Sequence, residues 1–372
     1  AITTGSGENV CVGNNAGTAM TTGQQNVFIG DNAAGGADVT GQTNVAVGDN
    51  AGYALTTGSN NILLGATAGD ANTTGSNNVA VGSAALTANT SASNNTACGY
   101  SALGSVTTGT GNAAIGTNAG DAISTGANNA AMGFHALSTV TTASNNVGIG
   151  SYSGDAITTG AGNTLCGINA GTTLTTGNNN IAVGLNSLMS ATTGSHNHAV
   201  GDSALGTLTT GQYNVALGHY TAGLTTTPTF NVSIGHGTMT SGTTGGNNTA
   251  VGGQALYYNQ TGSENTAIGR FALGGPSANS HSSNTAVGSQ AAAGITTGNE
   301  NVFLGASAGV SSVATTTGAG NIYIGRSSHG SAGTNTKEIV VGYNSTGKGS
   351  NTGFINPNSG GVYQGNNSTT WS

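Results

Sequence analysis

The sequence predicts an all-β protein, a parallel β-solenoid or β-roll of about twenty coils with about 17 residues in each, and two observations support this fold class. The motif Asn-x-x-x-Gly recurs from Asn9 to Asn321 at an almost constant step, as from Asn61 to Asn78, and a twentieth copy at 338–342 begins with Glu. The chain also contains 67 Gly, 3 Pro and only 4% charged residues, whereas globular proteins are usually about 25% charged. A short fixed period indicates stacked units, because a single unit cannot bury a core alone.

The composition also excludes several other classes of protein. Disordered chains are usually rich in charge and Pro, and collagen needs Gly at every third residue with abundant Pro. This chain has little charge and only 3 Pro, so neither class is expected. The net charge of −7 is small for 372 residues and dispersed, so a nucleic-acid partner is not expected. The sequence has no run of about 18 apolar residues, so membrane insertion is not expected either.

Each motif predicts one short β-strand. We number its Asn as position 0, so that positions 1 to 3 are the strand and position 4 is the Gly. Every residue at position 3 is apolar and most residues at position 2 are Ala. Because side chains alternate between the two faces of a strand, positions 1 and 3 share a face. We expect position 3 to form the core, as at Val251 and Ile268, and position 2 to face another surface closely.

The rest of each coil predicts a second short strand and a turn. Position 7 is small and position 8 is mostly Gly or Leu, which indicates a second core contact. Thr-Thr-Gly then occurs intact twelve times and indicates a turn at the Gly. The Asn residues at position 0 are expected to form a ladder of stacked amides, as in other parallel β-stacks.

Such a coil has a thin core, and we therefore expect a homotrimer with its three-fold axis along the rod rather than a dimer or a monomer. The Ala column at position 2 would then pack against sister chains. The repeat organisation predicts a solenoid shaft over 1–342. The final segment, 343–372, breaks the register and is expected to be a C-terminal connector or tip.

The stretch NNTAVGGQALYYNQTGSENTAIGRFAL, from Asn247 to Leu273, resembles the repeat region of bacteriophage tail fibres of the type followed by an endosialidase-type intramolecular chaperone. It is also similar to the head repeats of trimeric autotransporter adhesins. The resemblance covers Asn9 to about Gly342. Chaperones of this family release themselves by cutting after a Ser that is followed by Asp. The resemblance therefore implies a possible processing end at Ser372.

Residues with catalytic or metal-binding chemistry are sparse, so an enzyme is the least expected class and no cofactor is expected. The weak candidates for metal ligands are His196, His198, His219 and His236. His219 and His236 share position 5 of neighbouring coils with Asp202, and a pH-sensitive contact or a solvated turn are the alternatives. At His198, which occupies position 1, a hydrogen-bonded inner histidine is favoured over a metal ligand.

The three cysteines follow the same positional logic. Cys98 and Cys166 occupy position 3 and are expected to be core residues, because a buried free Cys behaves as a small hydrophobe. Cys11 occupies position 2, where a small residue is expected. Their spacing matches no metal-binding motif.

The function that these features favour is structural and adhesive. A phage tail fibre on the virion, attached to other tail fibre or baseplate proteins, would bind a host-surface glycan or other receptor through repeated weak contacts. The candidate receptor contacts are Tyr257, Tyr258, Tyr363 and Trp371, together with the insertion at 276–283. The alternatives are a bacterial surface adhesin or filament with the same repeat, and an ice-binding solenoid that uses the Thr-Thr-Gly column.

Overall fold

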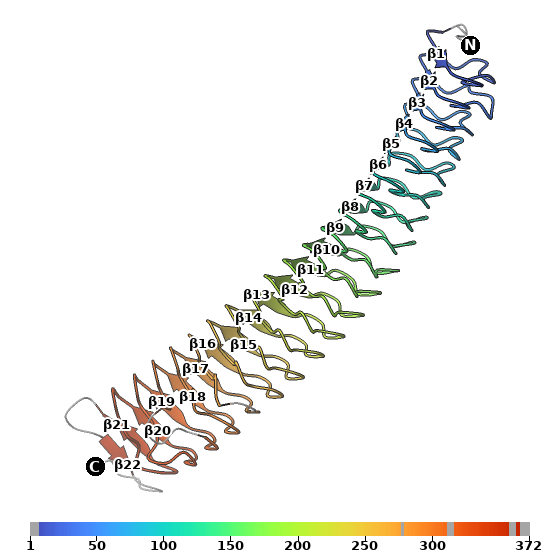
Figure 1. Ribbon diagram of the computed structural model, residues 1–372. Helices are drawn as coiled ribbons and strands as arrows, with labels where there is room; N and C mark the ends of the chain where they lie inside the picture. Colours follow the sequence, from blue (N-terminus) through green and yellow to red (C-terminus); the bar gives the residue numbers. More distant parts are fainter. Residues whose placement is uncertain (1–6, 277–278, 311–315, 357–361, 365–372) are drawn as a thin grey trace. The chain divides into compact units, whose positions relative to one another are not determined.

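The computed structural model describes residues 7–276, 279–310, 316–356 and 362–364. Over these residues the secondary structure consists of three-residue strands joined by turns and bends, with no helix (Figure 1). Consequently, no helix in the described part of the chain is long and apolar enough to cross a membrane. The chain divides into two compact units, residues 1–186 and 187–372, which are described separately below.

From residue 7 onward, where the structure describes it, the first unit contains eleven strands, β1 to β11. They are β1 (Val10–Val12), β2 (Val27–Ile29), β3 (Val45–Val47), β4 (Ile62–Leu64), β5 (Val79–Val81), β6 (Thr96–Cys98), β7 (Ala113–Ile115), β8 (Ala130–Met132), β9 (Val147–Ile149), β10 (Thr164–Cys166) and β11 (Ile181–Val183). Each strand pairs in parallel with the next, and equivalent positions lie opposite one another, as Val79 does with Thr96. Insertions between motifs therefore leave the strand register intact.

The described residues of the second unit form the other eleven strands. They are β12 (His198–Val200), β13 (Val215–Leu217), β14 (Val232–Ile234), β15 (Thr249–Val251), β16 (Thr266–Ile268), β17 (Thr285–Val287), β18 (Val302–Leu304), β19 (Ile322–Ile324), β20 (Ile339–Val341), β21 (Gly353–Ile355) and β22 (Val362–Gln364). Pairing is parallel from β12 to β21, and β22 pairs with β21 in the antiparallel sense. The predicted parallel β-solenoid with its almost constant coil length is confirmed.

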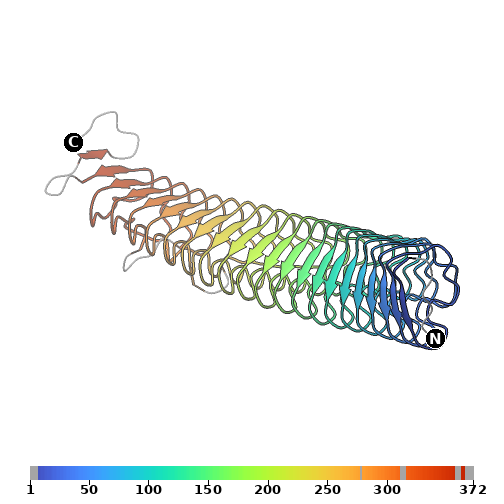
Figure 2. The ribbon, with the colours of Figure 1, turned by 90° about the horizontal axis from the view of Figure 1, so that it is seen from above.

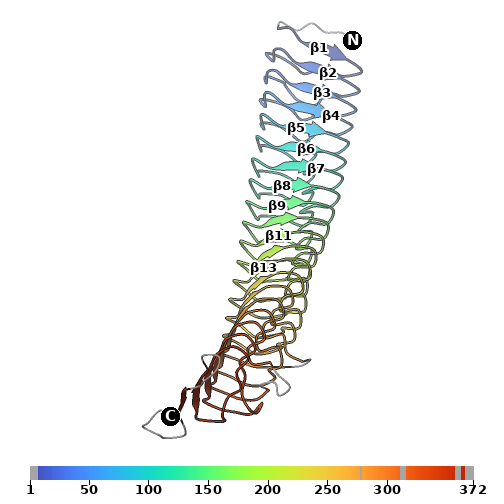
Figure 3. The same cartoon turned by 90° about the vertical axis from the view of Figure 1, so that its left-hand side faces the viewer.

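The strands of each unit follow one another along one side of the stacked coils, and the turns form the other sides (Figure 2, Figure 3). Backbone hydrogen bonds also join the turns of neighbouring coils, as from Leu86 N to Ala102 O at 3.1 Å and from Thr73 N to Thr90 O at 2.9 Å. The second strand expected at positions 7 and 8 is wrong. Leu86, at position 8, has a φ of 51°, which is the left-handed region rather than an extended conformation. Its expected core contact is confirmed, because Leu86 is fully buried.

The predicted facing of the strand is also wrong. Position 2 is the buried one, as at Ala250, whereas Val251 and Ile268 at position 3 lie at the surface of their coils. The reason is the Asn at position 0, which shares a strand face with position 2 and must bury its amide to complete the ladder described below. Position 3 therefore points outward even though all its residues are apolar.

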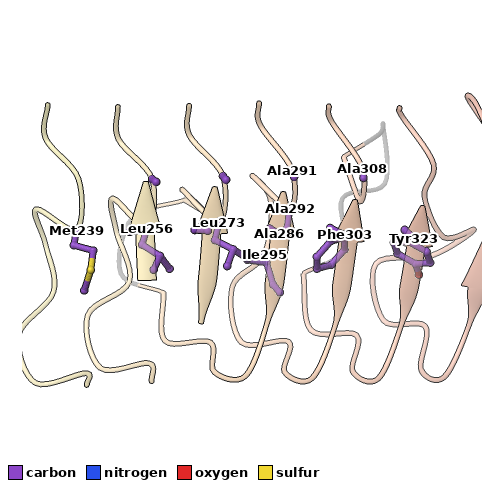
Figure 4. Packing of buried hydrophobic residues seen from close by; sticks show 14 of the residues in the cluster. Met239, Leu256, Leu273, Ala286, Ala291, Ala292, Ile295, Phe303, Ala308 and Tyr323 are labelled. Carbon is purple, nitrogen blue, oxygen red and sulfur yellow. The ribbon is translucent and has the colours of Figure 1, made fainter. Parts of the chain in front are cut away.

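The core of a coil consists of positions 2, 7 and 8 and a further buried residue at position 11, which is apolar in many coils and an Asn at Asn72, Asn89 and Asn259. Leu103 and Val106 supply positions 8 and 11 of one coil in the first unit, and both are fully buried. In the second unit the corresponding side chains line up from Met239 through Leu256, Leu273 and Ile295 toward Phe303 and Tyr323, one beside the next (Figure 4). Each coil thus contributes only a few large side chains, and the core becomes continuous only through stacking.

The Asn ladder is confirmed. Asn129 is buried, and its Nδ2 donates to Asn112 Oδ1 at 3.1 Å and, across its own coil, to the Ala143 carbonyl at 2.9 Å. Its Oδ1 in turn accepts from the backbone N–H of Asn146 at 3.0 Å. One side chain therefore closes its own coil and joins it to both neighbours, which explains why no smaller or apolar residue replaces it.

Glu338 takes the Asn position in the twentieth motif and is also fully buried. Its backbone N–H donates to Asn321 Oδ1 at 3.0 Å, so the ladder continues to it. Its carboxylate accepts from Tyr323 Oη at 3.0 Å, Asn335 Nδ2 at 2.9 Å and Gly349 N at 2.7 Å. The longer Glu side chain thus accepts hydrogen bonds from three groups at the end of the regular repeats.

Candidate functional site

The strands of the first unit present an outer face, which we call the strand face. It consists of positions 1 and 3 of β1 to β11, two side chains from each of eleven strands, or 22 in all. None of them is charged, and all are apolar except Thr96 and Thr164. Its exposed large side chains range from 36% accessible at Ile181 to 46% at Ile115. Monomeric soluble proteins rarely leave so long an apolar surface uncovered.

Two of the cysteines lie on the strand face. Cys98 is exposed and Cys166 is half-buried, whereas Cys11, at position 2, is buried. The prediction that Cys98 and Cys166 are core residues is therefore wrong, for the same reason as at Val251 and Ile268. The thiols of Cys98 and Cys166 are free.

A cluster of aromatic and polar side chains, which we call the aromatic cluster, lies on the turns after β7, β8 and β9. Phe134 and Tyr152 are exposed and meet edge to face, with ring centroids 5.4 Å apart. His135 stacks on Tyr152 at 5.7 Å and contacts Asn118 Nδ2 through its Nε2 at 3.2 Å. Partial burial raises the pKa of the Asp121 carboxyl, although the charge of nearby His135 acts in the opposite direction. Exposed rings beside an amide and a carboxyl form a surface that can both stack on a ligand and bond to it.

A row of stacked aromatic rings joins three coils of the second unit. The regular spacing of these residues in the sequence could have predicted it. His196, Tyr213 and Phe230 take the same position in three successive coils. Their rings stack with centroids 4.8 Å and 5.0 Å apart, which matches the spacing of stacked coils. His196 therefore stacks on an aromatic ring. His198 is also exposed, so the expectation of an inner histidine there is wrong.

The column of Asp202, His219 and His236 forms as the register predicts. His219 and His236 stack with centroids 5.3 Å apart, and His219 Nε2 lies 3.7 Å from Asp202 Oδ2. Across the described residues, however, no group of three or more His, Cys, Asp or Glu side chains is placed to hold a metal ion. Parallel stacking aligns the rings face to face rather than directing their nitrogens to a common point.

The predicted receptor contacts fall into different environments. Tyr257 and Tyr258 are half-buried and meet edge to face at 4.6 Å. The backbone of Tyr363 pairs with Phe354 in the β21–β22 hairpin. Trp371 and Ser372 lie outside the described residues.

In the described part of the insertion at 276–283, the side chains of Asn279 and His281 are both buried. His281 is fully buried, and its Nδ1 lies 3.3 Å from Asn265 Oδ1 in the ladder. Burial lowers the pKa of His281 to about 4, although the Leu273 and His281 carbonyls oppose this shift. The imidazole is therefore neutral near pH 7 and serves the structure of its coil rather than a surface contact.

The two Thr residues of each Thr-Thr-Gly copy differ in their contacts. Thr56 and Thr73, the first Thr of their copies, donate their hydroxyls to the carbonyl of the equivalent residue in the next coil, at 2.9 and 2.8 Å. The second Thr is exposed, as at Thr57 and Thr74. The first Thr thus helps to join neighbouring coils, and the second Thr forms an outward column.

In comparisons with known proteins, the chain matches no protein-family model and no curated protein.

Proposed function

We propose that this chain is a structural and adhesive segment of an extracellular fibre, a phage tail fibre that attaches to a host surface. The observation that carries the proposal is the division of each coil into fixed inner positions and variable outer ones. The Asn and the Gly hardly vary and positions 2 and 8 hold small or apolar residues, while positions 5, 6 and 16 hold aromatic, polar and charged residues in turn. Such a chain is suited to hold different contact groups at a constant spacing.

The contacts that the surface offers are those of stacking and hydrogen bonding. With 4% charged residues, electrostatic attraction to a partner is weak, whereas Asn, Thr, Ser and exposed aromatic rings suit a glycan. Single contacts of this kind are weak, and repetition along a trimeric fibre would raise the apparent affinity by avidity. We therefore propose a host-surface glycan as the receptor and the aromatic cluster, at Phe134 and Tyr152, as its first contact.

The experiment is a binding assay of the purified protein on host-cell surface glycans, with matched aromatic substitutions. Phe134→Ala and Tyr152→Ala should each lower binding at least several-fold, because stacking on an aromatic ring typically contributes about 1 kcal/mol or more. Tyr100→Ala, which removes an exposed ring elsewhere in the same unit, is the control and should bind normally. If the two cluster variants bind as the native chain does, this contact site is wrong.

A bacterial surface adhesin or filament with the same repeat is the second candidate, because the same outer positions would serve it equally. The two differ in what the fibre is attached to. Antibodies against the chain that label virion tails in electron micrographs would support the tail fibre, and labelling of the bacterial surface alone would support the adhesin.

A further inference from the structure

We propose that the aromatic cluster binds an organic ammonium group, which the host-surface glycan carries as a choline substituent or as a free amino sugar. This inference rests on the proposed function, because it names the chemical group that the same site recognises. It adds a requirement for positive charge that the proposed function does not have, since a neutral glycan can also stack on Phe134 and Tyr152. The two can therefore fail separately.

Aromatic rings form the walls of the cluster. Phe134 and Tyr152 are both exposed, and the planes of their rings lie at 87° to one another. The ring of His135 lies at 72° to that of Phe134 and nearly parallel to that of Tyr152. A group in the corner between perpendicular rings can be contacted from two sides. Because the face of an aromatic ring carries negative charge density, it attracts a cation within about 6 Å of its centroid.

Two carboxylates adjoin these rings. In another coil, a Cβ built on Gly223, at position 9, would lie 3.2 Å from Tyr220 Cε1, at position 6. Side chains at these two positions of one coil are therefore neighbours. Asp155 takes position 9 of the coil that has Tyr152 at position 6, and Asp121 takes position 9 two coils earlier. The cluster thus combines ring faces with negative charges, and both attract an ammonium group.

The charges of these two carboxylates are incompletely compensated. Asp121 Oδ1 is buried and has no hydrogen-bond partner among the described residues. Burial raises the pKa of Asp121 and the negative charge of Asp155 adds to this rise, although His135 and two backbone N–H groups oppose it. Asp155 accepts a hydrogen bond from the uncharged hydroxyl of Ser138. A cation beside both carboxylates would offset their burial and their mutual repulsion.

The side-chain charge of the whole first unit is also negative. Residues 1–186 contain acidic residues at positions 8, 31, 38, 49, 70, 121 and 155 of the sequence and no Lys or Arg. All 4 basic residues of the chain lie from Arg270 onward. No lysine or arginine of this unit therefore competes with a bound cation for the carboxylates. Although the charges are few, their common sign favours a positively charged ligand.

Other ligands match these observations less well. A metal ion needs several His, Cys, Asp or Glu side chains, and no suitable group of three or more occurs in the described part of the chain. An anionic sugar would be repelled by Asp121 and Asp155. A neutral sugar would stack on the rings and leave the buried charge without a partner. An organic cation interacts favourably with both the rings and the carboxylates.

Two matched pairs of small ligands test the requirement for charge on the native chain. Choline and its uncharged carbon analogue dimethylbutanol have nearly the same shape, and glucosamine and N-acetylglucosamine differ in whether the nitrogen is charged. In NMR titration, choline or glucosamine should bind at least about five-fold more tightly than its neutral counterpart. The cation that binds more tightly identifies the source of the ammonium group.

Variants that remove one negative charge test the residues. Asp121→Asn and Asp155→Asn keep the size of the side chain, and each should weaken binding of the cationic ligand several-fold. Asp70→Asn is the matched control. Asp70 also takes position 9 and also accepts a hydrogen bond from a hydroxyl, that of Thr87 at 2.7 Å, but it lies three coils from Asp121. Asp70→Asn should bind the cation as the native chain does.

Several outcomes would overturn the proposal. Equal affinities within both ligand pairs, or no binding of either cation, would exclude an ammonium group and leave the proposed attachment to a neutral glycan intact. Equal weakening by Asp70→Asn and Asp155→Asn would assign the attraction to the general charge of the unit rather than to the cluster. If Asp121→Asn fails to fold, Asp155→Asn and the ligand pairs still decide. Binding of a cation by a chain that does not bind host-cell glycans would instead reject the proposed function alone.

Discussion

Leu63 and Gly69 occupy one space in the core of their coil: a Cβ built on Gly69 would lie 2.7 Å from Leu63 Cδ2. Leu63 is at position 2 and Gly69 at position 8. In the next coil the small residue, Ala80, is at position 2 and the large one, Leu86, is at position 8, and both are fully buried. In these two coils the residues at positions 2 and 8 therefore fill a similar total volume, as close packing requires.

Exchanging the large and the small side chain between positions 2 and 8 of one coil should test this relationship. Leu63→Ala alone should destabilise the protein by about 2 to 5 kcal/mol, because it leaves a cavity. Gly69→Leu alone should destabilise it through overlap with Leu63. The double variant should recover most of the loss, since Leu86 already adopts a φ of 51° at this position, close to the 56° of Gly69.

Thermal unfolding of the four chains in a double-mutant cycle measures the effect. Additive losses in the double variant would mean that the two positions are independent.

Removal of one amide from the ladder should be costly. Asn129→Ala would leave the Asn146 N–H and the Ala143 carbonyl without their partner. A buried polar group left without a hydrogen bond costs about 1 to 3 kcal/mol. Asn14→Ala, which removes an exposed amide that bonds Asp31 at 2.9 Å, is the matched control and should have little effect.

Hydrogen exchange of the coils around residue 129 provides the measurement, because repeat proteins unfold locally. Equal exchange rates in the two variants would show that the ladder contributes little.

The Gly at position 4 is required for two physical reasons. Gly82 has a φ of 137°, and a Cβ there would lie 2.4 Å from the carbonyl oxygen of Gly99 in the next coil. Gly82→Ala should therefore separate the two coils and speed up hydrogen exchange in both. Gly104→Ala is the control, because its Cβ would meet nothing closer than 3.2 Å. Similar exchange in both variants would argue against close stacking at this turn.

Stability of the coil that contains His281 should depend on pH. The folded pKa of about 4 is below the ordinary value of 6.5, so between these values the unfolded chain binds a proton that the folded chain does not. Stability is thus complete above pH 6.5 and falls as the pH drops toward 4. The full shift corresponds to roughly 3 kcal/mol.

His281→Gln should remove this dependence, and His236→Gln, at an exposed histidine, should leave it unchanged. Hydrogen exchange of the local amides between pH 7 and 4, corrected for the intrinsic exchange rate, is the measurement. A native chain with constant local stability over this range would contradict the prediction.

Candidate contact residues were only partly predictable. The column of His219 and His236 followed from the register alone, because a fixed period places equivalent positions beside each other. The same rule would have identified Tyr213 and Phe230. The aromatic cluster at Phe134 and Tyr152 was harder to find, because these residues occupy different positions, 5 and 6, and meet only through the local path of the turns.

The sequence by itself determined the solenoid, its period, the strand positions and the Asn ladder, because a fixed step brings identical residues together whatever the shape of one coil. The facing of the strands was decided only by the tertiary structure. Both faces of each strand carry apolar residues, small at Ala250 and larger at Val251, so alternation alone allows either to be inside. The buried amide of Asn248 fixes the choice, because position 0 and position 2 share one face of the strand and the ladder holds that face inside.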